Sequence, residues 1–438
     1  MTSTLSSPMA AARSRFRRTT TGAAAAVLLG TTVLASGAMA APTDITLWRH
    51  IGDLQPEMDA FAASVESFNA AQEDWRIVWE ELPQRSYDQS INAAALAGSL
   101  PCVIDVDGPF VPNFAWGGTL IPIDDYIGDD LRADLLPSVV GEYNGKTYGV
   151  GQFDASLAIW GRKSVLEKNG IRIPVGLDDP WTKEEFDEAL LKLKESGEFE
   201  TAIDLFTFYT HEWLPYGYSP FLQSFGGDLI DRSTYLTAEG ALNGPEAVAW
   251  GEWWQSLFAD GLADPKSTDD QAFLQGRAAL AWIGNWYYPN MLEAWGEDLV
   301  YMSPPDLGAG PKVGGGSWQW AITSTCAHPD GAWAFIEYLL EPERVAELSD
   351  ITGLIPGRGA AAPLTERYGE GAALAGLVGV SNKFATIRPP TPAYMTIRVE
   401  FERAIQSIAN GGDVRDALDQ AVASIDADIE ANDGYGFQ

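Results

Sequence analysis

The sequence has few of the residues that bind metals, with 3 histidines and 2 cysteines among 438 residues. His50, His211 and His328 have no paired spacing and no Cys/His cluster beside them, so a zinc site is not predicted. A phosphate-binding glycine loop and a Gly-x-Ser-x-Gly nucleophile elbow are also missing. We therefore expect no metal and no cofactor. A pair of catalytic carboxylates stays open, because Asp and Glu are abundant and their separation is a three-dimensional property.

Basic residues are also scarce. The chain has 28 Lys and Arg against 61 Asp and Glu, which gives a formal net charge of −33. Four of the arginines lie in the first 40 residues, which contain no acid, so the net charge of the remaining chain falls to −37. Such a chain repels other polyanions, and nucleic acid and anionic membrane surfaces are not expected partners.

No apolar run reaches the length of about 20 residues that a membrane-spanning helix needs. The N-terminus instead has the pattern of a secretory signal: arginines within 13–18, an apolar stretch at 23–35, and the small-residue site Ala38-Met39-Ala40. We expect residues 1–40 to be removed after Ala40, by the general secretory route rather than the twin-arginine route. With no cysteine near that site, a lipid anchor is not predicted.

The two cysteines, Cys102 and Cys326, are far apart in the sequence. An exported protein meets an oxidising environment in which they can pair, but two buried free thiols fit the sequence equally well. Both interpretations stay open at this point.

Strand and helix patterns alternate along the chain. Strands are predicted at 44–48, 76–79 and 102–106. Between them, the apolar spacing of Met58, Phe61, Val65 and Phe68 predicts a first helix, and a second is predicted at 87–100. This alternation predicts parallel strands connected by helices. A second α/β unit is expected from the strand at 157–160 and the helix at 181–194 onward. Further helices are predicted at 245–258, 330–340, 342–348, 394–409 and 414–429. A chain of this length exceeds the size of a single core, so we expect two lobes.

Aromatic residues are abundant, with 16 Trp, 15 Tyr and 18 Phe. Trp213, Tyr216, Trp286 and Trp318 stand beside Gly, Pro, Asn or Gln, where turns rather than packed elements are expected. The glycine triplet at 314–316 is likewise predicted to be a flexible loop or turn. A pyranose has a weakly polar C–H face and a rim of hydroxyls, so its site needs aromatic platforms together with amides or carboxylates. The sequence supplies both.

Taken in order along the chain, several short segments resemble the family 1 extracellular solute-binding proteins of ABC importers, the maltose-binding-protein-like group. The segments are ITLW at 45–48, GSLPCVI at 98–104, DGP at 107–109, YGYSP at 216–220, FGG at 225–227, GRAAL at 276–280, NW at 285–286, AWAFIEYL at 332–339 and GLIPGR at 353–358. Their order and spacing span essentially the whole chain after residue 40.

The resemblance implies an α/β, two-lobe periplasmic binding protein fold of type II, with interleaved chain crossings and a ligand cleft between the lobes. Lobe I is expected to comprise 41–153 and 321–372, and lobe II 154–320 and 373–438. The implied function is capture of a mono- or oligosaccharide in the periplasm by a monomer that delivers it to permease subunits in the inner membrane. A polyol, a sugar phosphate or another small solute is the alternative ligand, and a secreted glycosidase is the alternative class.

The resemblance also implies which residues contact the ligand. Asp107 and Asp154 are expected to accept sugar hydroxyls, with His50 and Gln319 as further polar contacts. Asp107 has a turn-capping role as its alternative, and Arg358 and Tyr394 each have a structural one. The full expected set is His50, Asp107, Asp154, Trp213, Tyr216, Trp286, Trp318, Gln319, Arg358 and Tyr394, with no catalytic residue among them.

Overall fold

The computed structural model describes residues 41–52 and 55–437. The expected signal peptide at 1–40 and its cleavage site therefore lie outside the described residues. Pro42–Gln438 forms a unit of its own, and the description below concerns this unit.

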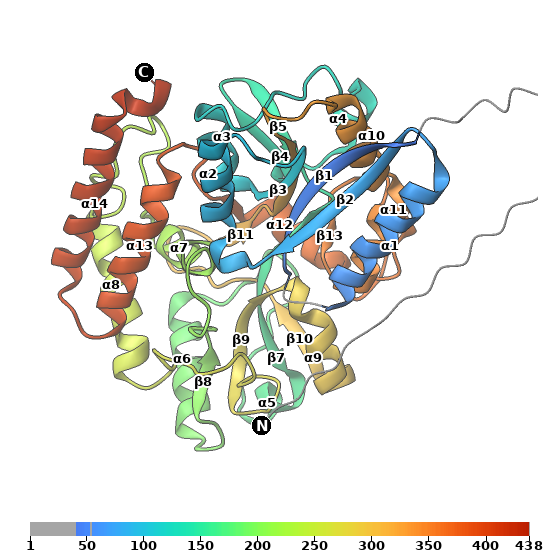
Figure 1. The fold of residues 1–438 in the computed structure, drawn as a ribbon. Coiled ribbons are helices and arrows are strands. Elements are labelled where there is room, and N and C mark those ends of the chain that lie inside the picture. The colour runs from blue at the N-terminus through green and yellow to red at the C-terminus, as the bar shows by residue number, and fades with distance from the viewer. Residues whose placement is uncertain (1–40, 53–54, 438) are drawn as a thin grey trace, which may run out of the picture. The chain divides into compact units, whose positions relative to one another are not determined.

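A six-stranded sheet is built around the first strands of this unit (Figure 1). In spatial order its strands are β2 (Trp75–Leu82), β1 (Thr43–His50), β3 (Val103–Asp107), β12 (Trp318–Ile322), β5 (Lys146–Val150) and β4 (Val140–Tyr143). β1 pairs in parallel with both β2 and β3, which confirms the predicted parallel arrangement. β12 pairs antiparallel with β3 and β5, so a strand from much later in the chain completes this sheet. The expected lobe boundary at 320/321 falls inside β12.

A four-stranded sheet contains the second group of strands. In spatial order they are β10 (Leu299–Met302), β7 (Leu157–Arg162), β9 (Ala278–Gly284) and β8 (Thr201–Asp204). All seven residues of β9 are buried, and neighbouring strands pair with it on both sides.

Two short sheets occur where the chain passes between the larger ones. β6 (Phe153–Asp154) pairs with β13 (Ile355–Pro356), and β11 (Val313–Gly315) pairs in parallel with β14 (Ala385–Ile387). The expectation of a flexible loop at the glycine triplet is therefore wrong for its first two residues. Gly314 packs so closely on helix α7 that a Cβ there would lie 2.6 Å from the backbone oxygen of Tyr216. Glycine serves close packing at this position.

The helices follow the predicted apolar periodicity in most places. They are α1 (Gln55–Ala71), α2 (Tyr87–Ala97), α3 (Val111–Trp116), α4 (Asp129–Asp134), α5 (Lys163–Lys168), α6 (Lys183–Glu195), α7 (Trp213–Phe225), α8 (Pro245–Ala259), α9 (Tyr288–Trp295), α10 (Pro329–Leu339), α11 (Pro342–Thr352), α12 (Ala375–Phe384), α13 (Tyr394–Ala409) and α14 (Val414–Ala431). Thr182 and Glu185 form a capping box at the start of α6, which explains why that helix begins where the sequence predicts.

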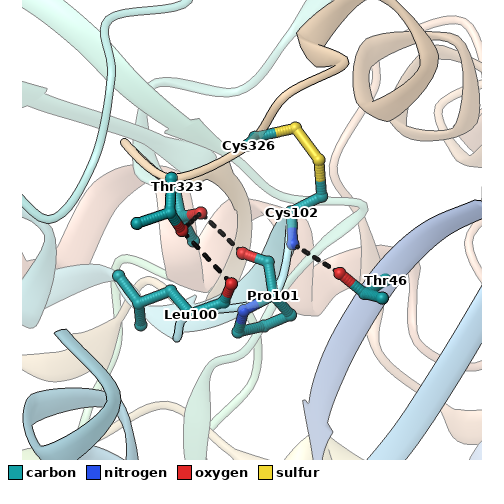
Figure 2. Close-up of a disulfide and its surroundings, with 7 residues drawn as sticks. Thr46, Leu100, Pro101, Cys102, Thr323 and Cys326 are labelled. Carbon is teal, nitrogen blue, oxygen red and sulfur yellow. Dashed lines mark hydrogen bonds between the residues drawn. A yellow bond between two sulfur atoms is a disulfide. The ribbon is translucent and has the colours of Figure 1, made fainter. Parts of the chain in front are cut away.

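Cys102 and Cys326 form a disulfide, which selects one of the two interpretations of the cysteines (Figure 2). Cys102 directly precedes β3 and Cys326 follows β12, so the bond joins two neighbouring central strands of the six-stranded sheet at one of their ends. Thr323 donates its hydroxyl to the carbonyl of Pro101 beside the bond, at 2.5 Å. Crosslink and hydrogen bond together fix the pairing of a late strand with an early one.

Candidate binding site

Three of the expected site residues meet at the other end of these strands, away from the disulfide. His50 ends β1 and Asp107 ends β3, so the two parallel strands deliver them to the same edge. Trp318 begins the antiparallel β12 and is the direct register partner of Asp107. In open α/β sheets this carboxyl edge is where ligands bind.

The imidazole of His50 is held on two sides. Its Nδ1 lies 2.6 Å from Oδ2 of Asp105, and its ring stacks on Trp318 with centroids 3.5 Å apart and planes 11° from parallel. The backbone N–H of His50 also donates to Asp105, at 3.1 Å. The Asp105 bond occupies Nδ1 and fixes the orientation of the ring.

A small, open pocket adjoins this stacked pair. Its walls come from β1, α1, β12, the short strand β6 and helix α11. It is lined by Arg49, His50, Glu57, Ala60, Phe61, Ser64, Asp105, Gln152, Phe153, Trp318, Trp320, Leu339, Arg344, Glu347 and Leu348. Both aromatic and charged side chains line it, a composition that suits a ligand with both apolar and hydroxyl-bearing surfaces.

Asp107, the register partner of Trp318, belongs to a buried ionic cluster. Both of its oxygens accept from Arg388, at 2.8 Å each, in a bidentate pair. Arg388 also donates to Glu212, and Glu212 accepts the hydroxyl of Tyr394. We call these four residues the carboxylate cluster. It joins the end of β3, the residue before α7, the segment after β14 and the start of α13.

Burial raises the pKa of carboxyl groups in and near the carboxylate cluster. Burial raises the pKa of Glu212 from 4.5 to about 7, although the charge of Arg388 opposes the shift. Burial likewise raises the pKa of Asp88, on α2, to about 6. One oxygen of Glu212 and the Nε of Arg388 have no hydrogen-bond partner. The cluster therefore keeps unused donor and acceptor capacity at the site.

A group of aromatic rings packs next to Arg388. The guanidinium lies 4.8 Å above the ring centre of Tyr216, which is 5.9 Å from Trp286 and 6.3 Å from Trp213. Trp213 and Trp286 meet edge to face at 6.2 Å. Trp286 is partly exposed, whereas Trp213 and Tyr216 are buried. We call these three residues the aromatic wall, and Trp286 is the member whose surface a ligand can reach.

The expectation that Trp213 and Tyr216 stand in a turn is wrong, because both belong to α7. Pro215 falls in the first turn of this helix, where a missing N–H costs nothing, and Gly226 ends it with a φ of +103°. Almost the entire helix is buried. Of the prolines and glycines that indicated a turn, Pro215 and Gly226 mark the ends of a core helix, and Gly217 and Pro220 lie inside it.

Asp154 is placed at a chain crossing, where the hydrogen bonds to its oxygens come from the protein. Oδ1 accepts from the backbone N–H of Gly316 at 2.8 Å, and Oδ2 from the hydroxyl of Ser381 at 2.7 Å. Burial raises its pKa. Asp154 thus ties three distant segments together, and its expected contact with a ligand stays a prediction.

Two further expected residues lie apart from the stacked pair and the aromatic wall. Gln319 is buried on the other face of the sheet, against Gly108, Gly141 and Gly149. Arg358 binds Asp134 at 2.7 Å and the carbonyl of Leu340 at 2.7 Å. The structural alternative considered for Arg358 accounts for both of these contacts.

The structure adds two residues that sequence reasoning did not select, Glu212 and Arg388. Glu212 stands in the stretch His211-Glu212-Trp213 that was singled out for its aromatic residue alone. Arg388 was overlooked because its segment, followed by Pro389 and Pro390, has no periodic pattern. A charged residue beside consecutive prolines in a connecting segment was the available signal. Within 41–52 and 55–437, no group of three or more His, Cys, Asp or Glu side chains could hold a metal ion.

The chain is similar to proteins of a known family. Residues 63–375 match the family described as bacterial extracellular solute-binding protein, which covers well over half of the chain. The chain belongs to this family. It is therefore a solute-binding protein and not an enzyme, which confirms that expectation, and the family's extracellular character makes it an exported protein.

Individual relatives of this solute-binding protein are distant in sequence. A maltotriose-binding protein of Pyrococcus abyssi (strain GE5 / Orsay) is 25% identical over 324 residues, which are 71% of this chain and 66% of that protein. A cyclic α-maltosyl-1,6-maltose binding protein from Arthrobacter globiformis has a TM-score of 0.73 at 25% identity, over 89% of this chain and 100% of that one.

A maltose/maltodextrin-binding domain from Bdellovibrio bacteriovorus, bound to maltotriose, has a TM-score of 0.74 at 18% identity, with 89% and 100% of the two chains covered. These structures confirm the predicted two-lobe fold. No helix in the described part of the solute-binding protein combines the length and apolar character needed to cross a membrane.

Proposed function

We propose that this solute-binding protein captures an uncharged saccharide between the stacked pair of His50 and Trp318 and the aromatic wall, and delivers it to the permease of an ABC importer. The observation that carries the proposal is the contact series Trp318, Asp107, Arg388, Tyr216 and Trp286. It leads from an aromatic platform through a carboxylate and the buried Tyr216 to the partly exposed ring of Trp286. Pyranose rings need this combination of flat apolar faces and hydroxyl acceptors.

The named relatives support the same ligand class, because each binds a glucose-based oligosaccharide by its description. A phosphorylated sugar is disfavoured, since Arg388 is already paired with two carboxylates. The division into lobe I and lobe II, the periplasmic location and cleavage after Ala40 belong to this proposal. So do the monomeric state and closure of the lobes around the ligand.

The test is a thermal-shift screen of purified residues 41–438, followed by calorimetry. The panel contains maltose, maltotriose, mannobiose, glucose, sorbitol and glucose 6-phosphate. A saccharide at about 100 times its dissociation constant adds about 2.7 kcal/mol to the free energy of unfolding, which gives a clear rise in Tm. A selective rise with a neutral saccharide supports the proposal. A rise with glucose 6-phosphate alone, or no rise across a broad saccharide panel, overturns the ligand class.

A further inference from the structure

Arg388 is the cation at the centre of the carboxylate cluster. Its side chain is 3% exposed, and it makes a bidentate pair with Asp107 and a further ion pair with Glu212. Its guanidinium also covers the ring of Tyr216. Arginine provides what lysine lacks here, namely a planar fork that binds two carboxylates while stacking on an aromatic face.

The carboxylates that Arg388 joins come from different parts of the fold. Asp107 ends β3 of the six-stranded sheet, whereas Glu212 directly precedes α7, which packs on β11, α8 and α13. The segment that carries Arg388 is itself anchored, because Arg232 donates to the carbonyl of Ile387 at 2.8 Å. Pro389 and Pro390 then restrict the backbone that follows. The guanidinium is thus held in place independently of a ligand.

The charges in the cluster decide which ligands fit. Two buried carboxylates without a cation repel each other and carry a large desolvation cost, so a site containing only Asp107 and Glu212 would favour a cationic ligand. Arg388 supplies that cation from within the chain. A ligand with an ammonium group would then meet a guanidinium that already occupies three of the four carboxylate oxygens.

We infer that Arg388 is a specificity-determining residue of the binding site, an internal cation that makes the Asp107 and Glu212 pair accept uncharged saccharides and reject aminated ones. This inference rests on the proposed function, because it concerns the ligand of the same site. Asp107 and Glu212 keep acceptor capacity for hydroxyls only while Arg388 neutralises and orients them.

The experiment compares the wild type with Arg388→Ala, Arg388→Lys and the matched control Arg232→Ala. The control loosens the anchor of the same segment without touching either carboxylate. Neutral probes are maltotriose and mannobiose, and the cationic probe is chitotriose, the trimer of glucosamine. Affinities are measured by calorimetry at pH 7.5, where Glu212, with a pKa of about 7, is mostly ionised and part of the amino groups still carries charge, with and without millimolar methylguanidinium.

We expect Arg388→Ala to bind the neutral probe at least 10-fold more weakly and chitotriose at least 10-fold more tightly than the wild type. Methylguanidinium should reverse both changes by filling the vacated position. Arg388→Lys should keep the rejection of chitotriose while losing part of the neutral affinity, and Arg232→Ala should retain the wild-type selectivity. An unchanged ratio of neutral to cationic affinity in Arg388→Ala overturns the inference.

Failure of the proposed function gives a different result. If the wild type binds neither neutral probe, the saccharide assignment is lost, but the inference still predicts that chitotriose and methylguanidinium stabilise Arg388→Ala more than the wild type. If Arg388→Ala does not fold, Arg388→Gln carries the same two criteria, since it keeps polar contacts to the carboxylates without the charge. Equal responses of Gln variant and wild type would then overturn the inference.

Discussion

His50 and Trp318 stack face to face, with ring centroids 3.5 Å apart, at the edge where β1, β3 and β12 meet. The stack has a consequence for recognition, because one face of the indole is occupied by the imidazole and only the rest of its surface is open to a ligand. Asp105 fixes the imidazole in turn. A platform restrained in this way loses little conformational freedom on binding.

Substitution of Trp318 tests this platform. We expect Trp318→Ala to weaken binding of the best saccharide about 10- to 100-fold, because both the platform and the restraint on His50 are lost. Trp318→Phe keeps an aromatic face and should cost less than half of that free energy. Calorimetry measures the affinities, and equal affinities for the Ala and Phe variants would contradict a stacking role.

Trp286 is the accessible member of the aromatic wall. Trp286→Ala should weaken saccharide binding about 10-fold, with a small effect on Tm, because the ring is only partly buried. Trp116→Ala is the matched control, since Trp116 is 46% exposed and contacts Tyr435. An affinity loss of the same size in both variants would mean that Trp286 does not contact the ligand.

The disulfide should affect stability and not recognition. It crosslinks the start of β3 to the end of β12, whereas Asp107 and Trp318 lie at the opposite ends of these strands. We expect Cys102→Ala/Cys326→Ala to lose about 2 to 5 kcal/mol of unfolding free energy in urea titrations. Saccharide affinity, measured by calorimetry under folding conditions, should stay within a factor of about 3 of the wild type. A large loss of affinity in the folded double variant would contradict this separation.

Glu212 should make the unfolding free energy depend on pH. Its pKa is about 7 in the folded protein against 4.5 ordinarily, so the folded state holds the proton more tightly. Stability from this group is present at acidic pH and falls as the pH rises from 4.5 through 7. Glu212→Gln cannot ionise, and its stability should depend less on pH, by about 2 kcal/mol between pH 5 and 8. Urea unfolding at both pH values measures this, and parallel pH profiles for both proteins would rule it out.

Substitution of Asp154 distinguishes a structural role from direct contact with the ligand. If its oxygens serve Gly316 and Ser381, Asp154→Ala should lower the unfolding free energy by about 2 kcal/mol or more, because buried donors lose their acceptor. Ser381→Ala is the matched control and should lose only the smaller, side-chain part of that stabilisation. A variant of Asp154 with normal stability but much weaker saccharide binding would instead support direct ligand contact.

Much of this fold could be predicted from local patterns. The apolar spacing of Met58, Phe61, Val65 and Phe68 predicted α1, and α13 begins and ends at the predicted residues. Order and spacing of short segments also identified the family. Such signals are readable because helix and strand periodicity and capping involve residues that are near neighbours in the sequence.

The candidate site was predicted only in part. His50 and Asp107 were expected because they follow predicted strands in a chain that resembles the family, and Trp318 because it is an aromatic residue near glycine in an expected turn. Helix α7 was missed because proline and glycine have the same local signature at a helix end as in a turn. The disulfide was left open for a related reason, since sequence does not place two distant cysteines within bonding distance.

The sequence by itself determined the α/β alternation, the excess of acidic residues and the family, and it predicted an export signal, because each depends on composition or on residues close together in the chain. Only the tertiary structure decided that β12 lies beside β3 and that Arg388 lies between Asp107 and Glu212, residues separated from it by 281 and 176 positions. Contacts over such separations arise when distant segments pack and bury their charges together, and a buried charge selects its partner by proximity in the fold.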